Sequence, residues 1–209
     1  MLQTSHPDTH CTETNLISHL SDKEIIMNRR QAIQTIGGGA LAGFSAINAK
    51  AGIVQAGNTV SLKCLGQLNG RRYLDGRTGD GSVGLAPGLV KPYSGTKWKI
   101  YNSGGGSFAL LCLGSNTGPR WLDGRTANGT VGLAPTTNKP YTGTRWLILP
   151  VQGGYTLKCL GDVEGPRWLD GRTENATVGL AKSTDPPFTG TRWEINIYPV
   201  CFDTPCPLP

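Results

Sequence analysis

Along most of the chain, apolar and polar residues alternate over short stretches that are separated by glycine, proline, asparagine and threonine. Towards the C-terminus such stretches cover residues 155–160, 167–172, 177–181 and 191–198. Alternation with a period of two residues, bounded by turn formers, predicts β-strands. No segment has the pattern of a long amphipathic helix, and 30 glycines and 14 prolines suit tight turns. We therefore expect an all-β fold.

The pattern occurs three times, in copies of about 47 residues at about 59–102, 107–150 and 154–197. Each copy contains Leu-x-Cys-Leu-Gly, Leu-Asp-Gly-Arg-Thr, Val-Gly-Leu-Ala and a final Gly-Thr-Lys-Trp or Gly-Thr-Arg-Trp. One copy cannot bury its apolar face alone, so the copies must close on one another. A β-propeller would need about four blades or more. The alternative is a β-trefoil of three four-stranded repeats, with six strands in a short barrel and six in a hairpin cap.

The first copy resembles the repeats of known β-trefoil families. Its segments Val60-Ser-Leu-Lys-Cys-Leu, Arg72-Tyr-Leu-Asp, Val83-Gly-Leu and Trp98-Lys-Ile are similar to the fascin-like repeat. The Gly-Thr-Arg-Trp of the later copies is similar to the Q-x-W strand of ricin-B-type lectin repeats, although the glutamine is missing. The resemblance covers about residues 59–198 and implies a β-trefoil domain at 52–198.

The two ends of the chain differ in composition from the repeats. Residues 27–51 have the anatomy of a signal peptide, with Arg29 and Arg30 before a weakly apolar stretch and a small-residue cleavage site at Ala51. The paired arginines resemble a twin-arginine leader, with a Sec leader as the alternative, so we expect a leader in helical or disordered form and export to the periplasm or the extracellular space. Residues 1–26 are then a disordered extension or a misassigned start. In the Pro-rich tail at 199–209 we expect a disulfide between Cys201 and Cys206, with an intermolecular bridge as the alternative.

The amino-acid composition limits the classes of function that we expect for this chain. All three histidines precede residue 20, so a processed chain would hold none, and histidine is the commonest general base and metal ligand. We therefore expect no enzyme activity, no cofactor and no metal. The net charge of +6 is mild, which suits glycans, including acidic ones, better than nucleic acid. Three consecutive glycines interrupt the apolar leader, so we expect no membrane span once the signal is removed.

Each copy carries one cysteine on its first strand, at Cys64, Cys112 and Cys159. Three thiols without histidine make a poor zinc site, so we favour small buried side chains over metal ligands. Trp98, Trp146 and Trp193 end the copies at a position that favours core packing over ligand stacking.

Leu-Asp-Gly-Arg-Thr is the sharpest candidate for a site. Strand alternation predicts an aromatic ring, a carboxylate and a guanidinium on one face, which is chemistry suited to a sugar ring and its hydroxyls. The structural alternative is a tight turn at Asp-Gly, an Arg–Asp bridge and an aromatic side chain on the barrel wall. An aromatic residue after proline forms a second candidate platform in each copy. The candidate ligand-binding residues are Tyr73, Asp75, Arg77 and Tyr93; Trp121, Asp123, Arg125 and Tyr141; and Trp168, Asp170, Arg172 and Phe188.

These observations predict a secreted, monomeric, lectin-like protein with up to three equivalent sites and no catalysis, whose partner is a glycan or polysaccharide. The alternatives are a protein-binding trefoil of the enzyme-inhibitor type and a structural protein of the cell surface or matrix.

Overall fold

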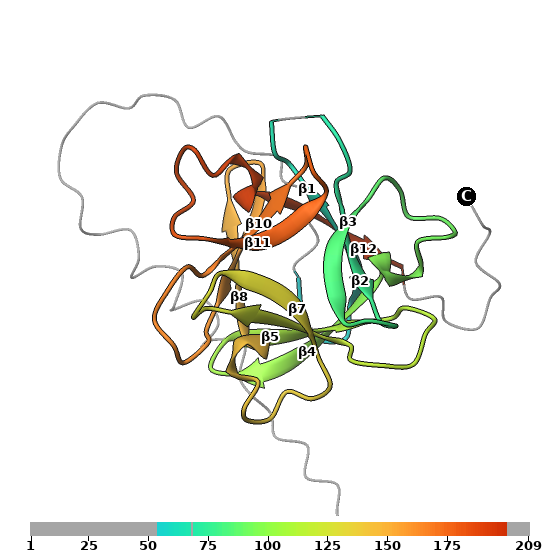
Figure 1. The fold of residues 1–209 in the computed structure, drawn as a ribbon, viewed down its shortest axis with the longest axis vertical. Coiled ribbons are helices and arrows are strands. Elements are labelled where there is room, and N and C mark those ends of the chain that lie inside the picture. The colour runs from blue at the N-terminus through green and yellow to red at the C-terminus, as the bar shows by residue number, and fades with distance from the viewer. Residues whose placement is uncertain (1–53, 68, 200–209) are drawn as a thin grey trace, which may run out of the picture. The chain divides into compact units, whose positions relative to one another are not determined.

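The computed structural model describes residues 54–67 and 69–199, which form an all-β domain (Figure 1). The described residues contain no α-helix, and a short 3-10 turn precedes the last strand of each sequence copy. The strands are β1 (Thr59–Cys64), β2 (Tyr73–Arg77), β3 (Ser82–Ala86), β4 (Trp98–Gly104), β5 (Ser107–Cys112), β6 (Trp121–Arg125), β7 (Thr130–Ala134), β8 (Trp146–Val151), β9 (Gly154–Cys159), β10 (Trp168–Arg172), β11 (Thr177–Ala181) and β12 (Trp193–Tyr198). The 3-10 turns are η2 (Ser94–Thr96), η3 (Thr142–Thr144) and η4 (Thr189–Thr191).

The strands join into one antiparallel sheet that closes on itself. Its ring of ten strands runs β11-β3-β2-β1-β12-β9-β8-β5-β6-β7 and closes where β7 pairs with β11. The two remaining strands extend it, because β4 pairs with β1 and β5, and β10 pairs with β11 and β9. The all-β prediction is confirmed, but the prediction of a β-trefoil is wrong: the described strands form a closed ten-stranded barrel with two extra strands.

The physical reason for this difference lies in the edges of the hairpin strands. The trefoil prediction treated these strands as a separate cap, yet β3, β7 and β11 pair with one another around the centre of Figure 1. Glycine favours this close approach, since a Cβ on Gly84 would lie 3.2 Å from the carbonyl oxygen of Ala176, a tight contact. The neighbouring Leu85 amide donates to that same oxygen at 3.0 Å. Sequence alternation predicts strands, but it does not predict which of their edges meet.

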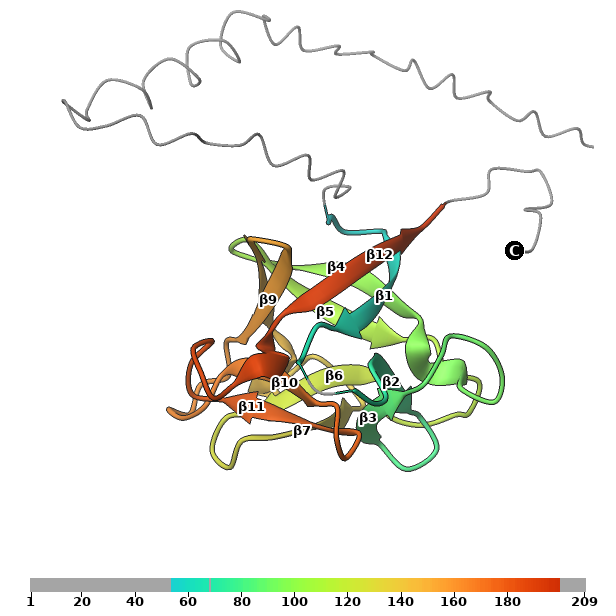
Figure 2. The same cartoon turned by 90° about the horizontal axis from the view of Figure 1, so that it is seen from above.

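Large side chains from every copy fill the barrel. Trp98, Trp146 and Trp193 are fully buried, and each indole Nε1 donates to the carbonyl of the leucine 24 residues earlier, at 3.0–3.1 Å. A buried indole needs such a partner because an unpaired donor away from water is costly. The prediction that these tryptophans belong to the core is confirmed. In Figure 2, strands β2, β3, β6, β7, β10 and β11 lie towards one end of the barrel and β1, β4, β5, β9 and β12 towards the other.

The cysteines connect one copy to the next. Cys112 Sγ lies 3.3 Å from the carbonyl oxygen of Gly76 and 3.5 Å from that of Gly95, both in the preceding copy. Burial raises the pKa of each thiol, and raises that of Cys159 to about 11. All three are buried and unbridged, so their interpretation as core side chains is confirmed. The described residues contain no group of three or more His, Cys, Asp or Glu side chains able to hold a metal ion.

Several predictions about the ends of the chain fall outside the described residues. The N-terminal extension at 1–26, the signal peptide at 27–51 and the Cys201–Cys206 disulfide all lie there. Within the described part, no helix is long and apolar enough to cross a membrane.

Candidate functional site

The Leu-Asp-Gly-Arg-Thr motif forms the first strand of each hairpin. In β6, Leu122 points into the core, Asp123 is only 6% exposed, and Arg125 lies at the exposed end of the strand. Gly124 cannot carry a side chain, because a Cβ there would lie 2.7 Å from Cys159 Sγ and 3.0 Å from the Trp146 ring. Packing therefore accounts for the leucine and the glycine, while the arginine reaches the surface and the aspartate lies largely buried beneath it.

The aspartate lies under the 3-10 turn of its own copy. A Cβ on Gly143 of η3 would come within 2.7 Å of Asp123 Oδ1, so the turn covers the carboxylate and only a glycine fits above it. In the first and third copies the glycine amide of the turn hydrogen-bonds to the corresponding carboxylate of Asp75 or Asp170. One function of this aspartate is therefore structural: it fixes the turn that precedes the final strand.

The arginine forms an ion pair with the aspartate. Arg125 Nε lies 3.7 Å from Asp123 Oδ2, and Arg172 and Asp170 repeat the pair at 3.7 Å. The arginine side chain is 53% exposed in the second copy, so it stays accessible to solvent while it pairs with the aspartate. The structure thus brings together two members of the predicted triad.

The aromatic residues that begin these strands lie elsewhere. Trp121 does not line the groove described below; its ring packs edge-to-face on Tyr101, with centroids 5.3 Å apart. Trp168 has the ammonium of Lys158 5.4 Å from its ring centroid. Tyr73, in the first copy, is half-buried and lies opposite Lys63 of β1. Other side chains thus lie against the rings of Trp121 and Trp168, which sequence alternation alone does not reveal.

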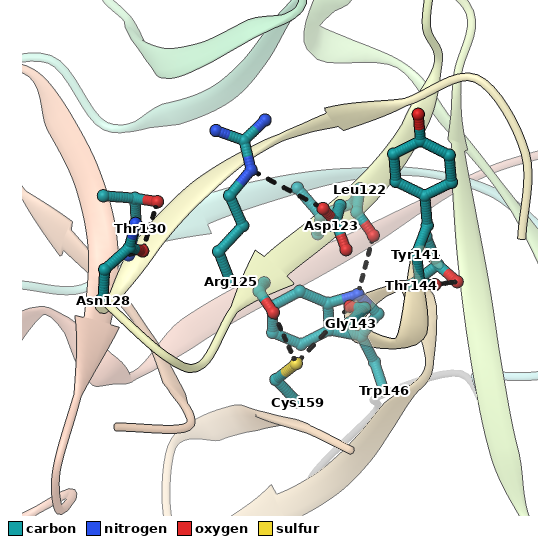
Figure 3. A network of polar contacts seen from close by, with 11 residues as sticks. Leu122, Asp123, Arg125, Asn128, Thr130, Tyr141, Gly143, Thr144, Trp146 and Cys159 are labelled. Atoms are coloured by element: carbon teal, nitrogen blue, oxygen red, sulfur yellow. Dashed lines mark hydrogen bonds and ion pairs between the residues drawn. The ribbon is translucent and has the colours of Figure 1, made fainter. Parts of the chain in front are cut away.

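A different aromatic residue completes the site. Tyr141, from the loop before η3, lines one groove with Asp123 and Arg125, and Figure 3 shows the carboxylate between the tyrosine and arginine side chains. The groove has a volume of about 120 Å³, and Pro140 and Val163 add apolar surface. Val163 belongs to the next copy, and Thr126 Oγ1 donates to its carbonyl at 2.6 Å. Two sets of residues that the sequence suggested separately therefore meet in one groove.

Burial and the arginine have opposite effects on the pKa of the Asp123 carboxyl group. Burial raises the pKa of Asp123 above its ordinary value, because the charged form loses solvation, and the nearby Arg125 guanidinium partly opposes this. Burial also raises the pKa values of Asp75 and Asp170. The groove lining combines a carboxylate oxygen as acceptor, a guanidinium as donor and an aromatic ring, all of which a polyhydroxylated ligand can use.

The other copies repeat the aspartate and the arginine of the groove, whereas several of its other lining positions differ between copies. Asp75, Arg77 and Tyr93 correspond to the second copy, whereas the third copy has Phe188 in place of the tyrosine. Phe188 lines a second and larger cavity, of about 260 Å³, together with Gln67 and Arg192. The sequence analysis missed Val163, Gln67 and Arg192. The one sequence feature that could have indicated Gln67 and Val163 is that positions 67 and 163 differ among otherwise similar copies.

A scan against protein-family models and a search of curated proteins find no match. Among solved structures, the chain is similar to Cry35Ab1, with a TM-score of 0.55 and 12% identity over 74% of this chain and 39% of that one. It is also similar to a GlcNAcα1-4Gal-releasing endo-β-galactosidase from Clostridium perfringens, with a TM-score of 0.51 and 13% identity over 68% of this chain and 33% of the enzyme. This chain thus spans about two-fifths or less of either protein, and the likeness is one of fold.

These search results also correct the family resemblance that was expected from the sequence. The resemblance to fascin-like and ricin-B-type repeats is wrong, since no family model matches and the similar structures are proteins of other kinds.

Proposed function

We propose that the protein binds glycans in the groove formed by Asp123, Arg125 and Tyr141, and that it binds without catalysing a reaction. The observation that carries the proposal is the convergence of these three side chains in one groove. An aromatic ring offers a face to the apolar side of a sugar, while a carboxylate and a guanidinium pair with its hydroxyls. The similar endo-β-galactosidase acts on a carbohydrate, which supports the same class of ligand at the level of fold.

The binding mode follows from the size and number of the grooves. A groove of about 120 Å³ can hold only part of a sugar ring, so each contact is weak. Corresponding residues occur in all three copies, and several weak sites on one rigid domain raise the avidity for a surface that displays many glycans. We propose that an exported monomer acts in this way outside the cytoplasm.

The proposed absence of catalysis rests on the acids of the groove. Hydrolysis of a glycoside usually needs two carboxyl groups that flank the bond. Among the described residues that line this groove, Asp123 is the one acid, and its carboxylate is paired with Arg125. The groove therefore suits binding better than acid–base chemistry.

A glycan array followed by calorimetry tests the proposal. The full chain should bind at least one class of oligosaccharide, and the Tyr93→Ala/Tyr141→Ala variant should bind that class at least about tenfold more weakly because it loses two stacking rings. Tyr101→Ala is the matched control: this exposed tyrosine lies outside the groove, and its loss should leave affinity unchanged. A folded protein that binds nothing on a broad array, or equal losses in the two variants, would contradict the proposal.

A further inference from the structure

The three junctions between successive copies are not equivalent. At each junction, the 3-10 turn of one copy faces the turn that follows the first strand of the next. In the first junction, Ser94 Oγ lies 3.0 Å from Ser115 Oγ and accepts from the Ser115 amide at 3.2 Å. In the second, the Asp162 amide donates to Thr142 Oγ1 at 3.1 Å. A side-chain hydroxyl thus closes both junctions.

The third junction lacks this bond. Thr189 and Gln67 stand at the corresponding positions, where the end of the third copy meets the start of the first. Within residues 54–67 and 69–199, no hydrogen bond joins them, and the cavity of about 260 Å³ opens there instead. We call this space the junction cavity; its lining includes Gln67, Pro186, Phe188, Thr189, Thr191 and Arg192.

The apolar side of the junction cavity is particular to the third copy. Pro186 replaces a lysine that the other copies carry at Lys91 and Lys139, and Phe188 replaces a tyrosine. These changes remove a flexible, charged lysine side chain and a tyrosine hydroxyl, and they leave a proline beside an aromatic ring. Such a surface fits the apolar face of a small ligand ring better than it fits a polar side chain. The volume falls just under the range of roughly 300–1,000 Å³ for drug-sized ligands, so one ring fits better than several.

The polar side of the junction cavity has one sign of charge. Arg192 supplies a guanidinium, Gln67 an amide and Thr189 a hydroxyl. None of the described lining residues is acidic; Asp185 belongs to the same loop but does not line the cavity. The groove around Asp123 differs, because its arginine is already paired with a carboxylate. Arg192 therefore remains able to pair with an anionic group on a ligand.

We propose that the junction cavity is a second binding site, specific for an acidic sugar unit whose carboxylate or sulfate pairs with Arg192. Phe188 and Pro186 contact the ring, and Gln67 and Thr189 hydrogen-bond to its hydroxyls. The class of ligand rests on the proposed glycan binding, whereas the site, its single occurrence and its preference for an anion are independent of the groove. A chain of alternating neutral and acidic sugars could then engage both kinds of site at once.

Calorimetric titration of the full chain with three probes tests the proposal: an oligogalacturonate, a sulfated galactose oligosaccharide and a neutral galactose oligosaccharide. Arg192→Gln should weaken binding of one or both acidic probes about tenfold or more and leave the neutral probe unchanged, because a charge-assisted hydrogen bond is lost. Arg145→Gln, at the corresponding position of the second copy, is the matched control and should change no affinity by more than about twofold. The two acidic probes separate recognition of a carboxylate from recognition of a sulfate.

A second variant closes the cavity instead of removing the charge. Gln67→Ser/Thr189→Ser installs the serine pair of the first junction and should abolish binding of the acidic probe while Arg192 is still present. Equal losses in Arg192→Gln and Arg145→Gln, or unchanged binding in the serine variant, would overturn the junction cavity as a site. Binding of the neutral probe that depends on Tyr141 would then leave the proposed function intact. Acidic binding that depends on Arg192, without any neutral binding, would overturn the groove instead.

Discussion

The thiol of Cys112 donates a hydrogen bond to the carbonyl of Gly76 across 3.3 Å, and this contact joins the second copy to the first. Cys159 and Gly124, and Cys64 and Gly171, repeat the contact at 3.3 Å, so every copy is connected to the one before it in cyclic order. The glycine has to be a glycine because sulfur and the edge of a tryptophan occupy the space where a Cβ would stand. Much of the repeated motif therefore serves the closure of the barrel.

The first prediction concerns this close contact. In Gly76→Ala the new Cβ would lie 2.7 Å from Cys112 Sγ and 2.9 Å from the Trp98 ring, so the core must shift. Overpacking of this kind costs about 1–3 kcal/mol of unfolding free energy, measured by urea denaturation. Gly88→Ala is the control, because no atom lies within 4 Å of a Cβ there and stability should hardly change. Similar midpoints for the two variants would show that the core yields more easily than the contacts imply.

The second prediction concerns reactivity. Burial raises the pKa of the Cys64, Cys112 and Cys159 thiols, which leaves almost no thiolate at neutral pH, and the side chains are also shielded from reagents. Native protein should therefore resist alkylation by iodoacetamide at these positions for hours at pH 7.5, and denatured protein should react within minutes. Peptide mass spectrometry measures the two rates. Fast alkylation of native Cys159 would contradict its burial.

The strands could be predicted closely from alternation, whereas the way they close could not. The expected strands at 155–160 and 177–181 correspond to Gly154–Cys159 and Thr177–Ala181. A sequence pattern indicates which face of a strand is apolar, but closure depends on which backbone edges approach, and here the edges of β3, β7 and β11 meet at Gly84, Gly132 and Gly179. The β-trefoil prediction failed at this step.

The residues of the candidate site also fall into those that the sequence could place together and those that it could not. Asp123 and Arg125 could be placed together because they are two residues apart on one strand. Tyr141 could not, since a folded loop brings it to them from 16 residues further along the chain. Gln67 and Arg192 were missed for a related reason: they are 125 residues apart and meet only where the barrel closes.

The third prediction concerns a backbone position at which the copies differ. Ala176 has a φ of 59°, in the left-handed region, whereas glycine occupies the same hairpin position at Gly81 and Gly129, with φ of 74° and 73°. A Cβ is unfavourable there, so Ala176→Gly should raise the unfolding free energy by up to about 1 kcal/mol, less what the lost methyl contacts contribute. The reverse change, Gly129→Ala, should lower it. Thermal unfolding followed by circular dichroism measures both, and opposite shifts in midpoint are the expected result.

The last prediction is a pH dependence with a definite sign. Burial raises the pKa of Asp75, Asp123 and Asp170 above 3.8, their ordinary value in an unfolded chain. The folded state thus binds these protons more tightly than the unfolded state does. Acidification from the folded-state pKa down to about 3.8 should favour folding, while the ionised form costs stability above that window.

Asparagine variants isolate this effect because they remove the titration and keep a similar shape. The unfolding free energy of the wild-type chain minus that of Asp75→Asn/Asp123→Asn/Asp170→Asn should increase as the pH falls from 7 to 4. Asp80→Asn is the control with the opposite sign: hydrogen bonds from the Ser82 amide and hydroxyl lower the pKa of Asp80, so the wild-type chain should lose stability relative to that variant on acidification. Urea titrations at several pH values measure both differences. Slopes of the same sign in the two comparisons would contradict the assigned pKa directions, and with them the view that η2, η3 and η4 enclose these carboxylates.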